Sequence, residues 1–162
     1  MHTKDAIAFA LTVSNRAVLS VIDDMSAAPT TFPTPNGGCH PLWVLGHLAL
    51  IEGSIPAILT GEPNPVDDWR RYFGQDTEPV ADPAAYPPFA EVRDTYVRLR
   101  ERNMALLASL SDADLDKPSA APPKEREREF ATYGSSFLVL ALHQMLHRSH
   151  VTDARRAARV AA

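Results

Sequence analysis

The sequence predicts an all-α fold, a four-helix bundle that forms a single domain over residues 1–162. Apolar residues recur at three- and four-residue spacing in four long stretches, which is the period of a helix with one buried face. The 14 prolines gather between these stretches and mark connections. With 162 residues and a hydrophobic fraction of 45%, the chain can bury one core of ordinary composition.

The first helix is predicted over residues 4–25. Ile7, Leu11 and Val18 share one face of it, and no glycine or proline interrupts the stretch. Residues 26–40 then carry three prolines and two adjacent glycines, which stop a helix and favour an irregular connection.

The second helix is predicted over residues 41–59. Pro41 stands at its first position, where a missing amide hydrogen does no harm, and Gly61 is placed to end it. Residues 42–51 are apolar nearly all round, which is typical of a helix packed on several sides. Pro56 is expected to bend its last turn.

A long connection is predicted over residues 60–86, with prolines at positions 63, 65, 79 and 83. Trp69, Tyr72 and Phe73 are possible anchors onto the core. Connections of this length usually carry function or are flexible, so we expect this one to shape a pocket.

The third helix is predicted over residues 88–110, with one apolar and one charged face. Residues 111–130 hold further prolines and a run of alternating charges at 124–129, expected to be a solvated strand edge, loop or short helix. The fourth helix is predicted to begin near residues 133–136 and to continue to about 159. Four long helices favour an antiparallel or partly crossed-over bundle.

The charge and the amino terminus limit the classes of partner. A formal net charge of -4 gives no general attraction to phosphate backbones, so nucleic acid is not expected as a partner. The first residues lack a secretory pattern, and no uninterrupted run of about 20 apolar residues predicts a membrane span. The expected compartment is the cytoplasm. Cys39 is the one cysteine and cannot form an internal disulfide.

The predicted fourth helix carries two histidines, His143 and His147, at a spacing that brings both onto one face. Both imidazoles can reach one metal ion, although such a pair can also be ordinary core or surface histidines. A metalloprotease would need a glutamate directly after the first histidine, where this chain has Gln144. A di-iron bundle would need several inward glutamates, and Glu52 is the one acid inside the second helix.

His47 is the best candidate for a third ligand. It lies within an almost wholly apolar helix, where an imidazole without a partner would be costly to bury. His40 lies on the same side, but at the end of the helix, where we expect exposure. His150 follows His147 by three residues and could be a fourth ligand, a group that supports a ligand, or an exposed end residue.

Three segments together resemble the DinB-like (DinB/YfiT) superfamily: residues 41–49 (PLWVLGHLA), 110–115 (LSDADL) and 141–148 (ALHQMLHR). The resemblance covers the whole chain. It implies a four-helix bundle that binds a divalent metal ion, zinc or nickel, through His47, His143 and His147. Family members often continue with arginine, glycine and glutamine after the last ligand, whereas this chain continues with Arg148, Ser149 and His150.

The resemblance also implies a range of functions. Characterised relatives include thiol-dependent S-transferases and a mycothiol-dependent isomerase, and homodimers are expected. The leading hypothesis is therefore a metal-dependent transferase that uses a low-molecular-weight thiol (bacillithiol, mycothiol or glutathione) and a small-molecule substrate. Three neutral imidazoles leave a coordination position open for such a thiolate, as in catalytic zinc centres. The alternative is a metal-binding or stress-response protein without turnover, because the sequence offers no clear catalytic acid or base.

Overall fold

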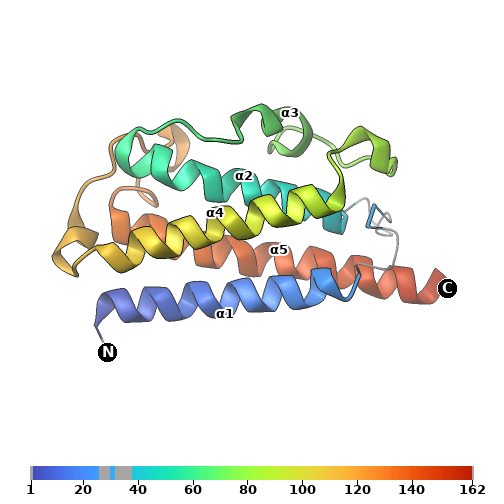
Figure 1. Ribbon diagram of the computed structural model, residues 1–162, viewed down its shortest axis with the longest axis horizontal. Coiled ribbons are helices and arrows are strands. Elements are labelled where there is room, and N and C mark those ends of the chain that lie inside the picture. Colours follow the sequence, from blue (N-terminus) through green and yellow to red (C-terminus); the bar gives the residue numbers. More distant parts are fainter. Residues whose placement is uncertain (1, 26–29, 32–37, 162) are drawn as a thin grey trace.

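The computed structural model describes residues 2–25, 30–31 and 38–161, and side chains as far as residue 158. Within these ranges the regular structure is helical, with no strand. Four long helices lie side by side (Figure 1), and they are α1 (Thr3–Asp23), α2 (Pro41–Thr60), α4 (Phe89–Ser109) and α5 (Tyr133–Ala161). The predicted all-α bundle is confirmed, with helix ends within about two residues of those expected. Most of the connection predicted over residues 26–40 lies outside the described residues.

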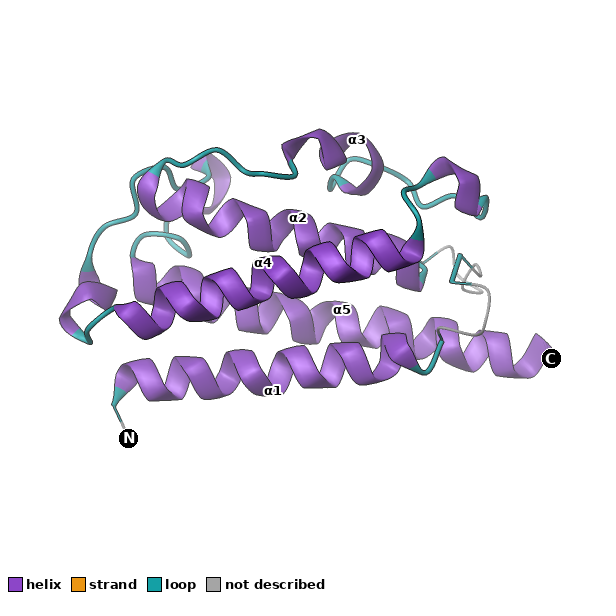
Figure 2. Cartoon of the chain, viewed as in Figure 1, coloured by secondary structure: helices purple, strands orange, loops and turns teal. Residues whose placement is uncertain are grey.

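The bundle is crossed over, which was one of the two topologies that the sequence allowed. Figure 1 shows α1 and α5 running in one direction and α2 and α4 in the other. Because α2 and α4 are parallel, the chain between them must return along the whole length of the bundle. That connection, seen in Figure 2, contains the short helix α3 (Arg70–Phe73) and the 3-10 turns Asp67–Trp69 and Pro83–Ala85.

Both ends of α2 follow the sequence pattern. Pro41 occupies the first helical position, and the Nδ1 atom of His40 accepts a hydrogen bond from the Trp43 amide, which caps the helix. Gly61 ends it with a φ of 78°, a left-handed conformation in which glycine is the favoured residue. The helix continues through Pro56, and most of its residues are buried. The charge run at 124–129 forms a 3-10 helix, Lys124–Arg126, followed by turns.

Among the described residues, two helices, α1 and α2, are long and apolar enough to cross a membrane by length and composition alone. The sequence analysis predicted no membrane span because it looked for an uninterrupted run of apolar residues, whereas these two helices qualify by their mean hydropathy. The apolar window of α2 is 83% buried inside the protein, as befits a core helix, whereas that of α1 is only 33% buried.

The core consists of two apolar clusters, one towards each end of the bundle. Val18, Val44 and Val151 belong to one cluster, and Leu11 and Phe137 belong to the other. The two clusters meet at the middle of the helices. A layer of buried polar side chains lies at that level.

All four long helices contribute to the polar layer, through Ser14 on α1, Glu52 on α2, Tyr96, Arg100 and Asn103 on α4, and Gln144 on α5. Glu52 Oε1 lies 2.9 Å from Arg100 Nη2, and its carboxylate accepts hydrogen bonds from Asn103 at 2.7 Å and Gln144 at 3.0 Å. Desolvation raises the pKa of Glu52, and the Arg100 charge opposes that shift. The pair is therefore an ionic contact shielded from water.

Gln144 uses both ends of its carboxamide in this layer. Its Nε2 atom also donates to the Tyr96 hydroxyl at 2.8 Å, and its Oε1 atom accepts from the Ser14 hydroxyl at 2.6 Å. The side chain thus bonds to one group on each of the other three long helices. Such directional contacts fix the rotation of α5 more tightly than apolar packing does.

Candidate metal centre

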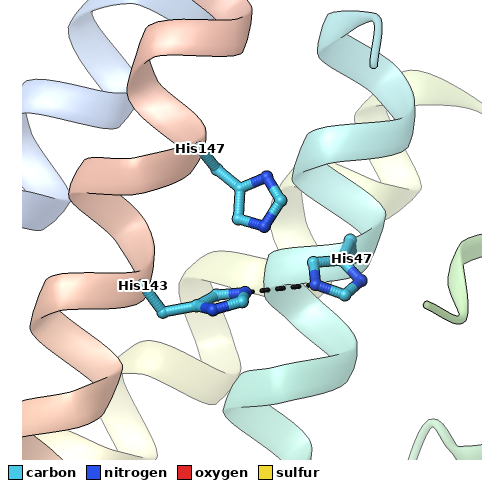
Figure 3. A group of neighbouring side chains, drawn as sticks. All are labelled: His47, His143 and His147. Carbon is cyan, nitrogen blue, oxygen red and sulfur yellow. Dashed lines mark hydrogen bonds between the residues drawn. The ribbon is translucent and has the colours of Figure 1, made fainter. Parts of the chain in front are cut away.

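Three histidines converge between α2 and α5. His47 projects from α2 towards His143 and His147, which lie one turn apart on α5 (Figure 3). Each offers a ring nitrogen, and these three atoms lie within 4.8 Å of one another. His47 and His147 are buried, with 6% and 7% of their surface exposed, and His143 is half-buried. The structure brings together the three residues that the sequence selected.

A backbone carbonyl fixes the tautomer of His47. The Nδ1 atom lies 2.8 Å from the carbonyl oxygen of Phe73. A carbonyl can only accept a hydrogen bond, so Nδ1 carries the proton and Nε2 keeps its lone pair. That Nε2 atom faces Nε2 of His143 at 3.1 Å. His47 therefore presents a metal-binding lone pair to the centre of the cluster.

The spacing of the rings fits a shared metal ion. Two nitrogens bound to one tetrahedral zinc ion at about 2.05 Å lie roughly 3.3 Å apart, close to the separation of His47 and His143. Imidazole donors suit zinc, nickel and similar divalent ions. The residues present fit a metal of this class.

Burial and mutual repulsion keep the three rings neutral. Desolvation, followed by the nearby His47 and the Arg126 charge, lowers the pKa of His143 to about 4. Desolvation and the neighbouring histidines lower the pKa of His147 to about 3, and burial lowers that of His47 despite its bond to the Phe73 carbonyl. Neutral imidazole is the form that binds metal, so the site is ready for an ion at neutral pH.

The long connection positions His47. Gly46 lies directly against the ring of Phe73, and a Cβ atom at this position would clash with it. This close approach sets the Phe73 carbonyl beside the imidazole. On the other side, the Trp43 ring stacks on His47 at a centroid distance of 4.9 Å, and its Nε1 donates to the Thr77 hydroxyl at 3.0 Å. Phe73 and Thr77 both belong to the connection, which therefore positions the His47 ring.

His40 and His150 lie outside the three-histidine cluster. The expectation that His40 is exposed is wrong, since only 2% of it is accessible, because the connection folds back over it. Its Nε2 atom hydrogen bonds to the Val80 carbonyl at 2.9 Å, and it takes no part in the cluster. His150 also lies outside the cluster, and its ring packs edge-on against that of His147 at 5.1 Å.

An open cleft of about 1,040 Å³ begins one helical turn from His47. Ile51, Ser54 and Ile58 line it from α2, and they continue the face that carries His47 at four- and three-residue spacing. The connection contributes Gln75 and Asp76, among others. The segment between α4 and α5 contributes Arg126, whose charge lowers the pKa of His143. The three histidines do not line this cleft themselves; it approaches them through Ile51, one helical turn from His47, and through Arg126.

Comparison with known protein families agrees with this geometry. A model described as the DinB superfamily matches residues 10–151, which include all three histidines. The chain belongs to the DinB superfamily. No curated protein matches the sequence. The structure contains both the DinB-like helical bundle and the three-histidine cluster that the resemblance implied.

The sequence did not reveal two features of this DinB-superfamily site. One is the Phe73 carbonyl that orients His47, since any residue type supplies a carbonyl. The other is the polar layer around Gln144, whose partners lie on three other helices. One sequence signal could have indicated the polar layer. Helical periodicity assigns Glu52, Arg100 and Asn103 to the core, where polar residues are uncommon.

The first prediction concerns the ligand set. His47→Ala, His143→Ala and His147→Ala should each abolish stoichiometric binding of zinc, measured by elemental analysis after dialysis. His40→Ala is the matched control, because it removes the buried histidine that caps α2 and lies outside the cluster. It should cost about 1 kcal/mol of stability and keep the metal. Full occupancy in any of the three ligand variants would contradict the assignment.

The second prediction concerns acid stability without metal. Unfolded histidines bind protons near pH 6.5, whereas folded His143 and His147 do so only near pH 4 and 3. The unfolded state therefore binds more protons in this window, and stability should fall as the pH drops from 6.5 towards 3. Melting temperatures of the metal-free protein should show this decline. The decline should be shallower in the His143→Ala/His147→Ala double variant, and an equal slope would refute the prediction.

The third prediction tests the support of His47. Gly46→Ala should push Phe73 away and weaken zinc affinity by about 10- to 100-fold, as loss of a supporting contact does in other metal sites. Gly53→Ala is the control, since its Cβ would meet Asn64, another residue of the connection, away from the histidines. Competition titration with a chelator should show a clear loss for Gly46→Ala alone. Equal losses in both variants would mean that general destabilisation is responsible.

Proposed function

We propose that this protein is a metal-dependent enzyme of the thiol S-transferase type. His47, His143 and His147 hold a divalent metal ion, zinc or nickel, and a low-molecular-weight thiol such as bacillithiol, mycothiol or glutathione binds to that ion. A small electrophilic molecule is the second substrate. The single observation that carries the proposal is the convergence of three neutral imidazoles beside an open cleft.

The chemistry of the donor set supports this reaction class. Three neutral ligands leave the ion with its full positive charge and with a coordination position to fill. When bound, such an ion favours the thiolate form of a thiol at neutral pH. In the transfer, sulfur forms a bond to an electrophilic carbon, and the leaving group departs with the electron pair of the broken bond.

The chain's own residues orient the site and receive the substrates. The Phe73 carbonyl fixes the tautomer of His47, and Trp43 covers one face of its ring. The cleft offers the apolar side chains Ile51 and Ile58, beginning one helical turn from His47, and Arg126 also lines it. We place the protein in the cytoplasm, where such thiols are kept reduced.

The test uses the cobalt-substituted protein. Adding a thiol should produce a sulfur-to-metal charge-transfer band, and subsequent addition of an alkyl halide should yield the thioether and release halide. His143→Ala should lose both signals, whereas His40→Ala should keep them. A band without thioether formation over a panel of electrophiles would reject the transferase activity. If no thiol perturbs the spectrum, the alternative of a metal-binding or stress-response protein without turnover replaces this proposal.

A further inference from the structure

The charged side chains that line the open cleft differ in whether a partner neutralises them. They are Glu62, Asp67, Arg70, Asp76, Glu125 and Arg126. Arg70 donates a hydrogen bond to Asp67 at 2.6 Å, and Arg102 donates one to Glu62 at 2.6 Å. The charge of Arg70 is therefore already matched. Arg126 is the other cation among the described residues that line the cleft.

Arg126 has no close carboxylate partner. Its ion pair with Glu129 is long, with 3.7 Å between Nε and Oε1, which exceeds a hydrogen-bonding distance. The two side chains are 45% and 50% exposed, and such pairs contribute little in water. Among the described residues the guanidinium donates no hydrogen bond. Its N–H groups are therefore available to a bound molecule.

An aromatic ring and the surrounding backbone hold Arg126 in place. The guanidinium carbon lies over the ring of Phe130, 5.0 Å from its centroid, in a cation–π contact. Phe130 is itself buried and lines the cleft, so the ring is a firm support. Its amide donates to the carbonyl of Arg126 at 3.1 Å, which closes a turn. A contact through the face of the guanidinium leaves the N–H groups at its edge unobstructed.

The segment that carries Arg126, between α4 and α5, is fixed to the bundle. The amide of Ala121 donates to the carbonyl of Ile58 at 2.9 Å, which ties the segment to the end of α2. The amide of Ser119 donates to the carbonyl of Ala131 at 2.9 Å and closes the base of the segment. The backbone therefore keeps Arg126 at the wall of the cleft.

Arg126 also lies within electrostatic reach of the three-histidine cluster. Its charge is one of the causes that lower the pKa of His143. Interactions between charges are largely screened beyond about 10 Å in ordinary buffers, so the two side chains are near neighbours. A small molecule that reaches the cluster can therefore place a second group against Arg126.

We propose that Arg126 forms a carboxylate-binding subsite of the cleft, and that one of the two substrates of the transfer carries a carboxylate. The second half of this inference rests on the proposed function. The planar fork of a guanidinium matches the two oxygens of a carboxylate, and Ile51 and Ile58 offer apolar surface to the rest of the molecule. Glutathione and bacillithiol carry carboxylates and mycothiol carries none, so the subsite discriminates among thiols if the thiol is the substrate that it binds.

The remaining acids of the cleft favour a carboxylate over a phosphate. Asp76 and Glu125 line the cleft, and neither has an ion-pair or hydrogen-bond partner among the described residues. A ligand with two negative charges would be repelled by both. A single carboxylate gains the contact with Arg126 at a smaller electrostatic cost.

Equilibrium binding of a probe without sulfur tests the subsite apart from the reaction. Phenylacetate and phenylacetamide have the same shape and differ in charge, and amide chemical shifts in the full chain report their binding. Phenylacetate should bind at least about 10-fold more tightly than phenylacetamide. The preference should persist in His143→Ala, which is expected to lack the metal ion, so this result does not depend on the proposed function. Inorganic phosphate should not displace phenylacetate, and displacement would overturn the choice of a carboxylate.

Variants of the charge run identify the residue responsible. Arg126→Ala and Arg126→Gln should both remove the preference for phenylacetate over phenylacetamide. Arg128→Ala is the matched control, because Arg128 is an exposed arginine of the same run that does not line the cleft. It should keep the preference in full. Equal binding of the two probes to the wild type, a preference that survives Arg126→Ala, or an equal loss in Arg128→Ala would overturn the subsite.

Two further arms decide which substrate carries the carboxylate, in the cobalt-substituted protein with Cys39→Ser to remove the one protein thiol. If it is the thiol, Arg126→Ala should weaken the charge-transfer band of N-acetylcysteine by about 10-fold in affinity and leave that of N-acetylcysteine amide unchanged. If it is the electrophile, Arg126→Ala should slow thioether formation with iodoacetate and not with iodoacetamide.

The two arms also separate this inference from the proposed function. If neither arm responds to Arg126→Ala while transfer proceeds, the carboxylate does not belong to a substrate and that half of the inference is wrong. If no thiol gives a band and no thioether forms, the proposed function fails together with that half. The preference for phenylacetate then still decides whether the subsite exists.

Discussion

The buried pair of Glu52 and Arg100, with Gln144 bonded to the same carboxylate, is the interaction on which the arrangement of the helices depends. Apolar contacts above and below it are non-directional, and helices packed only by them can slide and rotate. Buried hydrogen bonds and ion pairs are directional, so they allow few other positions and rotations of the helices. Removing one partner of such a pair costs about 3–5 kcal/mol, because it leaves the other charge buried and unpaired. We infer that this layer sets the register of the bundle.

The three-histidine cluster takes its geometry from the same layer. Gln144 directly follows His143 in α5, so the turn of helix that is fixed to Ser14, Tyr96 and Glu52 on one side presents histidines on the other. A small rotation of α5 would break several buried hydrogen bonds at once. The position that carries a glutamate in zinc proteases thus serves here to orient the helix. A metal site requires side chains that are held in place in this way.

Helical periodicity was sufficient to predict which three histidines come together, because it fixes the face of a helix on which each side chain lies. His143 and His147 share a face by spacing, and His47 stood out as a polar residue among buried apolar ones. The prediction failed where chain segments distant in sequence come together. His40 is buried by Val80 of the long connection, and the path of such a connection is not encoded in a local pattern. The contact of the Phe73 carbonyl with His47 could not be predicted either, because every residue type has a backbone carbonyl.

The separation of the three histidines along the chain has a consequence for the kinetics of folding. His47 and His143 are 96 residues apart, and the crossed-over connection and α4 lie between them. The site can close only when α2 and α5 have docked, which requires closure of a large loop. A contact that forms after the transition state of folding acts mainly on the rate of unfolding. An ion bound there would work as a clasp between the two halves of the bundle, prolonging the lifetime of the native state while leaving the speed of its formation almost unchanged.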